Sequence, residues 1–281
     1  MRREPIVRRP RLSAEGGLSS TSASSGRHLA LLGAAAEAGV IQTTRTRVRT
    51  DRAAVIQERV DLLIAGFPRF LECFARKPAF KRSGQYEFHR ETVDLRAAAG
   101  SADAALRDPR FIDALYRTLR AWGIGLRQSR LAAQSAFAAA LHRSASDIAA
   151  FDGMTLGDAN LDASVVSDRL WRLIDTLGIV ENEAKLVAGT KALHHLIPNL
   201  VVPIDREFTG SFFGWHRPEL QYRQGRCLTQ ALVAFARIAR AVDPRQYVGN
   251  GWNTSSTKVI DNALVGLFIA AEELVAARSA G

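Results

Sequence analysis

Residues from Asp51 onward follow a helical pattern, which constrains the fold more than any other feature of the sequence. Apolar residues recur at three- and four-residue steps, as in the run from Val55 to Phe74, and no segment alternates apolar with polar residues as a strand does. Glycine and proline interrupt the pattern, as at Gly66-Phe67-Pro68. The pattern predicts an all-α fold of about ten helices in two lobes with a central cleft.

Capping and turn residues mark where these helices begin and end. Asp108 precedes Pro109, a pair typical of a helix start, because aspartate accepts free N–H groups and proline suits the first turn. A helix that ends near Pro198 is followed by a short extended stretch to Pro203, and we expect the next helix to begin at Ile204-Asp205. The longer predicted helices span 86–99, 132–141, 164–177, 181–196, 228–242 and 257–277.

Positive charge is concentrated at the N-terminus. Residues 1–52 hold ten arginines and four acidic residues, so they contribute +6 to the net charge of +10. The Ser-rich run from Leu18 to Gly26 is typical of a segment that does not pack. We therefore divide the chain into a flexible basic arm, residues 1–50, and an all-α domain, residues 51–281. The arm either grips nucleic-acid phosphates or reflects an arginine-rich coding bias, since the whole chain has only five lysines.

Several classes of protein are excluded by what the sequence lacks. No apolar run approaches the ~20 residues of a membrane span, and no apolar region with a cleavage site follows the first arginines, so no secretory signal is expected. The sequence has no phosphate-binding P-loop, no zinc-protease HExxH and no hydrolase GxSxG. The two cysteines, Cys73 and Cys227, lie far apart and predict a cytoplasmic protein with no disulfide framework. Adjacent His194 and His195 point about 100° apart on a helix, so we expect no metal site there.

The segment 181–206 carries the most information about function. Its helix leads through an apolar, proline-containing stretch to the sequence Val202-Pro203-Ile204-Asp205. This segment resembles the core of the helix-hairpin-helix superfamily of DNA glycosylases, in which such a stretch leads to a catalytic aspartate at the start of the next helix. The resemblance implies that Asp205 is the catalytic carboxylate. Bifunctional members carry a lysine slightly under twenty residues before the aspartate, and Lys185, 20 residues before it, is a better positional match than Lys191, 14 residues before it.

The hairpin itself departs from the family pattern. Family members usually turn on a Gly-apolar-Gly tripeptide whose N–H groups bind a DNA phosphate, whereas this chain has Val180-Glu181-Asn182-Glu183-Ala184. Two acidic side chains repel phosphate at that place. We therefore favour water over a lysine as the nucleophile, and hence a monofunctional enzyme. The family's optional iron–sulfur cluster needs four cysteines, so we expect no cofactor.

The resemblance implies an enzyme that hydrolyses the N-glycosidic bond of a damaged or modified base flipped out of double-stranded DNA. Such an enzyme serves either genome repair or defence against phage that carry modified DNA. The alternative is a non-catalytic helical module that binds DNA or a protein and uses Asp205 only as a helix cap. An open, basic cleft around Asp205 favours the enzyme, whereas a buried ion pair of Asp205 with Arg206 or Lys258 favours the module.

Further candidate residues come from the polar loop before the last helix and from aromatic side chains near Asp205. Free N–H groups and a lysine at a helix start are typical of phosphate binding, and aromatic rings receive flipped bases. The DNA-binding candidates are Arg206, Trp252, Asn253, Ser255, Ser256, Lys258, Arg127 and Arg130. The base-pocket candidates are His194, Phe212, Phe213, Trp215 and Asp261.

Overall fold

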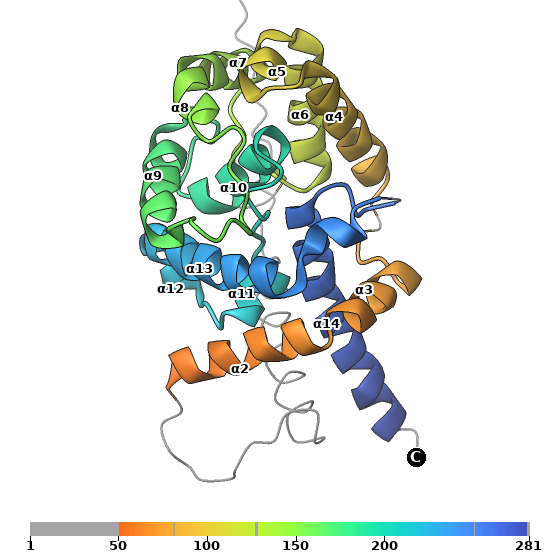
Figure 1. Ribbon diagram of the computed structural model, residues 1–281. Helices are drawn as coiled ribbons and strands as arrows, with labels where there is room; N and C mark the ends of the chain where they lie inside the picture. Colours follow the sequence, from red (N-terminus) through yellow and green to blue (C-terminus); the bar gives the residue numbers. More distant parts are fainter. Residues whose placement is uncertain (1–50, 81, 127–128, 250, 280–281) are drawn as a thin grey trace, which may run out of the picture.

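Figure 1 presents the computed structural model of the chain, which describes residues 51–80, 82–126, 129–249 and 251–279. This part of the chain forms thirteen α-helices and one 3-10 helix, and its one strand-like contact is an antiparallel bridge between Leu131 and Val180. The all-α prediction is therefore confirmed. The predicted basic arm, residues 1–50, lies outside the described residues. None of the described helices combines the length and apolar character that a bilayer crossing needs.

Helix α10 lies at the centre of the helical arch in Figure 1. α10 (Lys185–Leu196) contacts one packed pair, α4 (Gln85–Ala99) with α6 (Pro109–Ala121), and a second pair, α9 (Ala163–Thr176) with α13 (Gln224–Val242). Nine of its twelve residues are buried, because it has neighbours on several sides. Residues on α10 are thus placed where both pairs meet.

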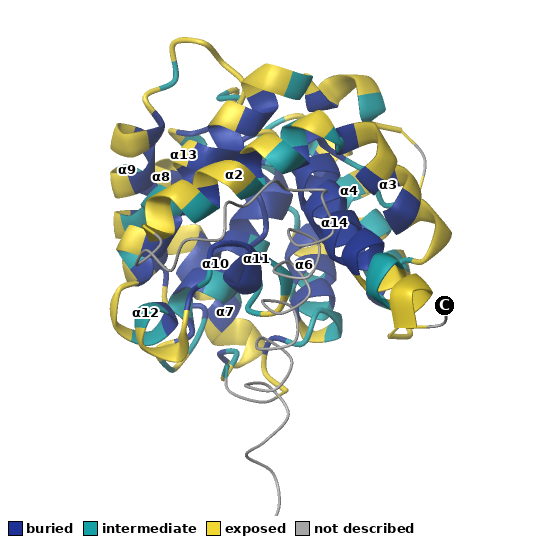
Figure 2. Ribbon diagram, turned by 90° about the horizontal axis from the view of Figure 1, so that it is seen from below, coloured by how far each residue is buried: buried dark blue, intermediate teal, exposed yellow. Residues whose placement is uncertain are grey.

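The last helix, α14 (Ser256–Ser279), is buried on every side over its first four turns. Every residue from Ser256 to Ala271 is buried, and Figure 2 shows this part of α14 in dark blue. Its main partner is α3 (Phe67–Arg76), which follows directly from α2 (Arg52–Ala65) at Gly66. The smaller helices complete the described fold: α5 (Ala102–Arg107), α7 (Gln134–Arg143), α8 (Ala145–Ala149), α11 (Phe208–Phe212), α12 (Arg217–Tyr222) and the 3-10 helix η2 (Pro244–Tyr247).

Side-chain caps fix several helix starts, as the sequence indicates. Asp108 accepts the N–H of Arg110 at 2.9 Å at the start of α6, so the Asp-Pro prediction is confirmed. Asp162 accepts two N–H groups at the start of α9, from Ser164 at 3.0 Å and from Val165 at 3.1 Å. Such caps stabilise a helix by about 1 kcal/mol each.

Two predicted helix starts are wrong. The helix expected at Ile204-Asp205 begins at Phe208 instead, since residues 201–205 have no regular secondary structure and residues 206–207 form a turn. The helix expected at Glu181 begins at Lys185, because the preceding residues pair with a separate segment: Glu181 N–H donates to the Arg130 carbonyl at 2.8 Å. Backbone pairing between distant segments overrides the local helical pattern here.

Gly266 sits where α14 crosses α3, and it permits backbone contact between the two helices. A Cβ atom built on Gly266 would lie 1.8 Å from the carbonyl oxygen of Phe70. No side chain fits at this distance, so the helices approach each other only because residue 266 has none. The close packing of α14 on α3 depends on this contact.

We expect Gly266→Ala to lower the free energy of unfolding by at least about 2 kcal/mol, because the methyl group must push α3 and α14 apart. The sign of this change identifies its cause, because replacing glycine by alanine in an unconstrained helix interior stabilises the protein by about 1 kcal/mol. Chemical denaturation measures the change. Gly249→Ala, with no atom within 4 Å of the added Cβ, is the control and should leave stability close to that of the wild type. Equal stability of both variants would contradict the close approach.

Candidate active site

Asp205 lies at the point where the extended segment after α10 enters α11. One carboxylate oxygen, Oδ1, accepts the N–H of Phe208 at 2.6 Å and that of Thr209 at 3.2 Å, and Thr209 Oγ1 accepts the N–H of Asp205 at 3.3 Å. Upstream, the N–H of Ile204 donates to Thr190 Oγ1 at 3.1 Å, which ties this segment to α10. The other oxygen, Oδ2, has no hydrogen-bond or ion-pair partner among the described residues. The residue is partly exposed, and its position is set through Oδ1.

The pKa of Asp205 is raised above its ordinary value because burial disfavours the carboxylate. The positive charge of Lys191 and the N–H groups of Phe208 and Thr209 oppose the shift without cancelling it. Desolvation therefore outweighs the two N–H contacts and the charge of Lys191. A carboxylate with a raised pKa accepts a proton more readily, as a general base must.

The structure brings Lys191 to Asp205 and leaves Lys185 elsewhere. Lys191 Nζ donates to the carbonyl of Trp122 at 3.2 Å and lies 5.8 Å from the centroid of its ring. Burial lowers the pKa of Lys191, while the nearby Asp205 carboxylate raises it. Lys185, at the first position of α10, instead donates to Asp175 Oδ1 at 2.7 Å. The better positional match to the family's lysine is therefore engaged in a different ion pair.

Lys258 points into the protein rather than toward DNA. Its side chain is 1% exposed, and Nζ donates to Asp261 Oδ2 at 2.5 Å and to Asn262 Oδ1 at 2.8 Å. The ammonium also lies over the rings of Phe80, Trp252 and Trp122, with centroid distances of 4.3, 5.4 and 5.6 Å. Its predicted role as a direct phosphate contact is wrong in this structure, because the ammonium is buried and paired inside the protein. Asp261, predicted in the base pocket, serves instead as the buried partner of Lys258.

Four charged groups thus act on one another at this site. Asp205 raises the pKa of Lys191 and of Lys258, and Asp261 does the same to both lysines. Two ammonium groups and two carboxylates balance in charge, and the two that are fully buried, Lys258 and Asp261, each cost several kcal/mol to bury before pairing. We refer to Lys191, Asp205, Lys258 and Asp261 as the charge cluster. Costly buried charges of this kind are concentrated at functional sites in proteins.

A chain of neutral histidines lies beside the charge cluster. His195 Nδ1 is 2.8 Å from the Lys191 carbonyl, which only accepts, so His195 donates from Nδ1 and accepts at Nε2. His89 Nδ1 then donates to His195 Nε2 at 2.9 Å, which leaves His89 Nε2 to accept from Thr254 Oγ1 at 2.8 Å. All hydrogen bonds of this histidine chain therefore run in one direction, from Thr254 to Lys191. Burial lowers the pKa of His89 well below the ordinary histidine value and that of His195 to about 4.

His194, predicted in the base pocket, is instead buried at 1% exposure, and it supports the turn after α10. Its Nδ1 lies 3.0 Å from the Val201 carbonyl, to which it donates, and 3.1 Å from Thr257 Oγ1. Thr257 in turn donates to the Pro198 carbonyl at 2.6 Å. These contacts tie the start of α14 to the segment that leads to Asp205.

The polar loop before α14 contributes one aromatic side chain to the partly exposed rim of the site. Trp252 is partly exposed and packs against Phe80, Tyr86 and His89, with centroid distances of 4.9, 5.1 and 5.5 Å. Asn253 is partly exposed too, and its Oδ1 accepts from Asn262 Nδ2 at 2.8 Å. The structure thus places both residues beside the charge cluster.

The two serines of this loop are buried, which does not fit their prediction as DNA contacts. Ser255 Oγ accepts the N–H of Lys258 at 3.2 Å and so caps α14, and Ser256 Oγ donates to Asn199 Oδ1 at 3.3 Å. Both side chains serve the helix start rather than the surface, because the first turn of α14 lies inside the protein.

Three aromatic residues predicted in the base pocket belong to the core. Phe212 and Phe213 have no exposed surface, and Trp215 is 3% exposed. Phe213 stacks on Trp215 at 4.8 Å and meets Phe235 of α13 at 5.7 Å, while Trp215 Nε1 donates to Gln230 Oε1 at 2.7 Å. Their faces are covered by other core residues, so the pocket assignment of all three is wrong in this structure.

The three arginines predicted to bind DNA lie at separate places in the chain's structure or outside the described residues. Arg206 is partly buried, and burial together with the charge of Arg217 lowers its pKa. Arg130 is exposed and lies against the turn between α9 and α10, where its N–H donates to Asn182 Oδ1 at 3.1 Å. Arg127 lies outside the described residues.

Several residues at the site were not singled out from the sequence. Their spacing carries no shared pattern, since they come from four separate segments that meet only in the folded chain. Trp122 follows α6, and the rest surround it on the loop before α4, on α4 itself and on the loop before α14: Phe80, Arg82, Tyr86, His89 and Thr254.

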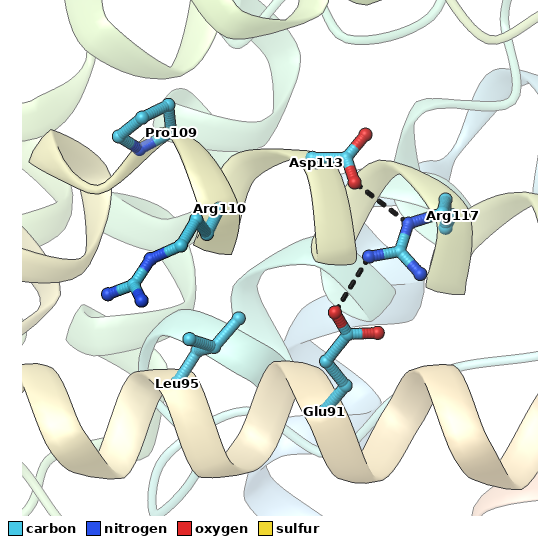
Figure 3. Close-up of a pocket in the computed structure, with 6 residues that line it drawn as sticks. All are labelled: Glu91, Leu95, Pro109, Arg110, Asp113 and Arg117. Carbon is cyan, nitrogen blue, oxygen red and sulfur yellow. Dashed lines mark hydrogen bonds and ion pairs between the residues drawn. The ribbon is translucent and has the colours of Figure 1, made fainter.

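A surface hollow of about 540 Å³ lies between α4 and α6 (Figure 3), and no residue of the charge cluster lines it. Arg117 crosses it, donating to Glu91 Oε1 at 2.8 Å and to Asp113 Oδ2 at 2.9 Å. These two carboxylates neutralise the guanidinium, whose pKa they raise. The hollow therefore contains a closed ion-pair network rather than a group free to bind a ligand.

Within the described ranges, no three His, Cys, Asp or Glu side chains are grouped so that they can hold a metal ion. Comparisons of the chain with protein-family models, with curated proteins and with solved structures found no match.

The lowered pKa of His195 makes a prediction about acid stability. Between about pH 6.5 and 4 the unfolded chain protonates this histidine while the folded chain does not, so stability falls as the pH drops through that range. His195 alone accounts for about 3 kcal/mol of the loss. We expect His195→Gln, which retains one donor and one acceptor, to reduce the loss between pH 6.5 and 4, measured by urea unfolding at each pH. His142→Gln, at an exposed histidine, is the control. A His195→Gln profile parallel to the wild type would contradict the assignment.

Proposed function

We propose that this protein is a DNA N-glycosylase that hydrolyses the bond between deoxyribose and a damaged or modified base, with Asp205 as the essential carboxylate. The observation that carries the proposal is the state of that carboxylate. One oxygen is fixed by two N–H groups, the other has no hydrogen-bond partner among the described residues, and the residue is partly exposed within the charge cluster. The contact between the consecutive helices α9 and α10, followed by the Pro203-Ile204-Asp205 segment, agrees with the resemblance to helix-hairpin-helix glycosylases.

The proposed reaction places positive charge on the sugar as the base leaves. Asp205 stabilises that charge across the short distance between its free oxygen and the sugar. A water oxygen forms the new bond to C1′, and the electron pair of the broken C1′–N bond leaves with the base. Asp205 takes the proton of the attacking water and returns it to the departing nitrogen, so the reaction consumes one water and needs no cofactor.

A base that reacts in this way must first leave the duplex, which costs a few kcal/mol. Partly exposed aromatic side chains next to the charge cluster offer a stacking surface that recovers part of this cost. Trp252 is the best placed of them, since its ring is held by Phe80, Tyr86 and His89 while it remains partly exposed. We therefore propose Trp252 as the residue that contacts the extruded base.

Water remains the proposed nucleophile. Lys185 is engaged with Asp175, and Lys191 is the amine next to Asp205. Lys191 donates to the Trp122 carbonyl, which holds its ammonium in place beside the carboxylate. An electrostatic role for Lys191 agrees with this contact, whereas attack on C1′ requires the neutral amine.

Asp205→Asn should lower base release by about 100- to 10,000-fold, because the amide cannot carry the negative charge. The fold should persist, since the Asn side-chain oxygen still accepts from Phe208 and Thr209. The assay incubates the full chain with duplexes that each carry one modified base and reveals abasic sites by alkaline cleavage. Duplexes with oxidised or deaminated bases represent repair, and bulky phage-type modifications represent defence.

Asp162→Asn is the matched control, because Asp162 also accepts two N–H groups at a helix start. It should leave base release unchanged. If the wild type releases no base from any duplex while binding DNA or a protein, the non-catalytic module explains the chain instead, with Asp205 acting as a cap. Unchanged base release by Asp205→Asn would remove the carboxylate from the mechanism.

With water as nucleophile, borohydride should trap no covalent complex between the protein and a duplex from which it releases a base. A bifunctional glycosylase of the same superfamily serves as the positive control. A trapped adduct that disappears in Lys191→Gln, but persists in Lys185→Gln, would overturn the monofunctional assignment and identify Lys191 as the attacking amine.

A further inference from the structure

Arg82 lies at the edge of the site, on the loop between α3 and α4. Its side chain is exposed, and its guanidinium rests against Gly123, in the turn that follows α6. A Cβ atom on Gly123 would lie 2.9 Å from Arg82 Nη1, and Gly123 has a φ of +85°, so glycine suits this position on both counts. The absence of a side chain at Gly123 leaves room for the guanidinium.

Gln85 forms hydrogen bonds with both the Arg82 backbone and the Trp122 side chain. The N–H of Arg82 donates to Gln85 Oε1 at 2.8 Å, and the N–H of Gln85 donates back to the Arg82 carbonyl at 3.2 Å. Trp122 Nε1 donates to the carbonyl of Gln85 at 3.4 Å. Gln85 is itself buried. Arg82 is therefore set in a fixed position relative to Trp122, although its side chain faces solvent.

The guanidinium of Arg82 has no ion-pair or hydrogen-bond partner in the described part of the chain, and it lies close enough to the charge cluster to lower the pKa of Lys191. Two other arginines on neighbouring elements are paired, Arg96 on α4 with Asp152 at 2.7 Å and Arg117 on α6 with two carboxylates. An exposed guanidinium that is positioned but unpaired is suited to a phosphate, to which it donates two parallel N–H groups.

We propose that Arg82 binds a backbone phosphate of DNA, next to the nucleotide that Asp205 acts on. The ligand is a phosphodiester, recognised by charge and by the paired donors of the guanidinium. The position of that nucleotide at Asp205 rests on the proposed function, whereas phosphate binding by Arg82 is tested by DNA affinity alone.

The test measures binding of the full chain to a fluorescent duplex that contains an uncleavable tetrahydrofuran abasic analogue, by anisotropy between about 50 and 200 mM salt. Arg82→Ala should weaken binding about tenfold at the low-salt end. It should also reduce the slope of log affinity against log salt by about 0.9, the change expected for one lost phosphate contact. Arg82→Lys should retain the slope, because one positive charge remains, while losing part of the affinity.

Arg143→Ala is the matched control, since Arg143 is an exposed arginine in the last turn of α7. It should leave both affinity and slope at the wild-type values. A wild-type slope for Arg82→Ala overturns the role of Arg82, and a wild-type chain that does not bind the duplex overturns both this inference and the proposed function. If the salt slope drops as expected but no modified duplex loses its base, the glycosylase proposal fails and Arg82 as a phosphate-binding residue stands.

Discussion

The ion pair between Lys258 and Asp261 lies inside the first turns of a helix that is buried on every side, and the site is organised around it. An ammonium in that position is tolerated only if its surroundings compensate for lost water, since removing one partner of a buried pair costs about 3–5 kcal/mol. Asn262 supplies a second acceptor, and three aromatic rings cover the remaining faces. Those rings come from the loop before α4, the turn after α6 and the loop before α14. Solvation of one lysine thus brings together the segments that surround Asp205.

The helical architecture was predictable from the sequence because it depends on local features. Apolar spacing and caps such as Asp108 locate long helices well, since each involves residues within a few positions. Short helices are harder to predict in this way: α5, α11 and α12 each last only one or two turns, too few for a period to stand out. The start of α10 was misplaced because Glu181 pairs with Arg130, a contact 51 positions away in sequence that no local pattern records.

The candidate site was predicted less completely, and the reason lies in side-chain direction. Asp205 was found because it follows a recognisable Pro-apolar segment, but Lys185 and Lys191 were not separable by counting back from it. On a helix, six residues place these two lysines about 120° apart, whereas His194 and His195 lie within about 60° of Lys191. That shared face is visible in the sequence once α10 is known to be central. The inward turn of Lys258 was not foreseeable, because it depends on rings from three other segments.

The histidine chain has a polarity as well as a set of contacts. Its last acceptor is a backbone carbonyl at Lys191, which never donates, so the order of donors and acceptors is fixed back to Thr254. A substitute at position 89 or 195 must therefore donate one hydrogen bond on the side toward α10 and accept one on the opposite side. Side chains that only donate or only accept break the sequence of bonds at that link. Which side chains can replace these histidines thus depends on the direction of the hydrogen bonds as well as on size and hydrophobicity.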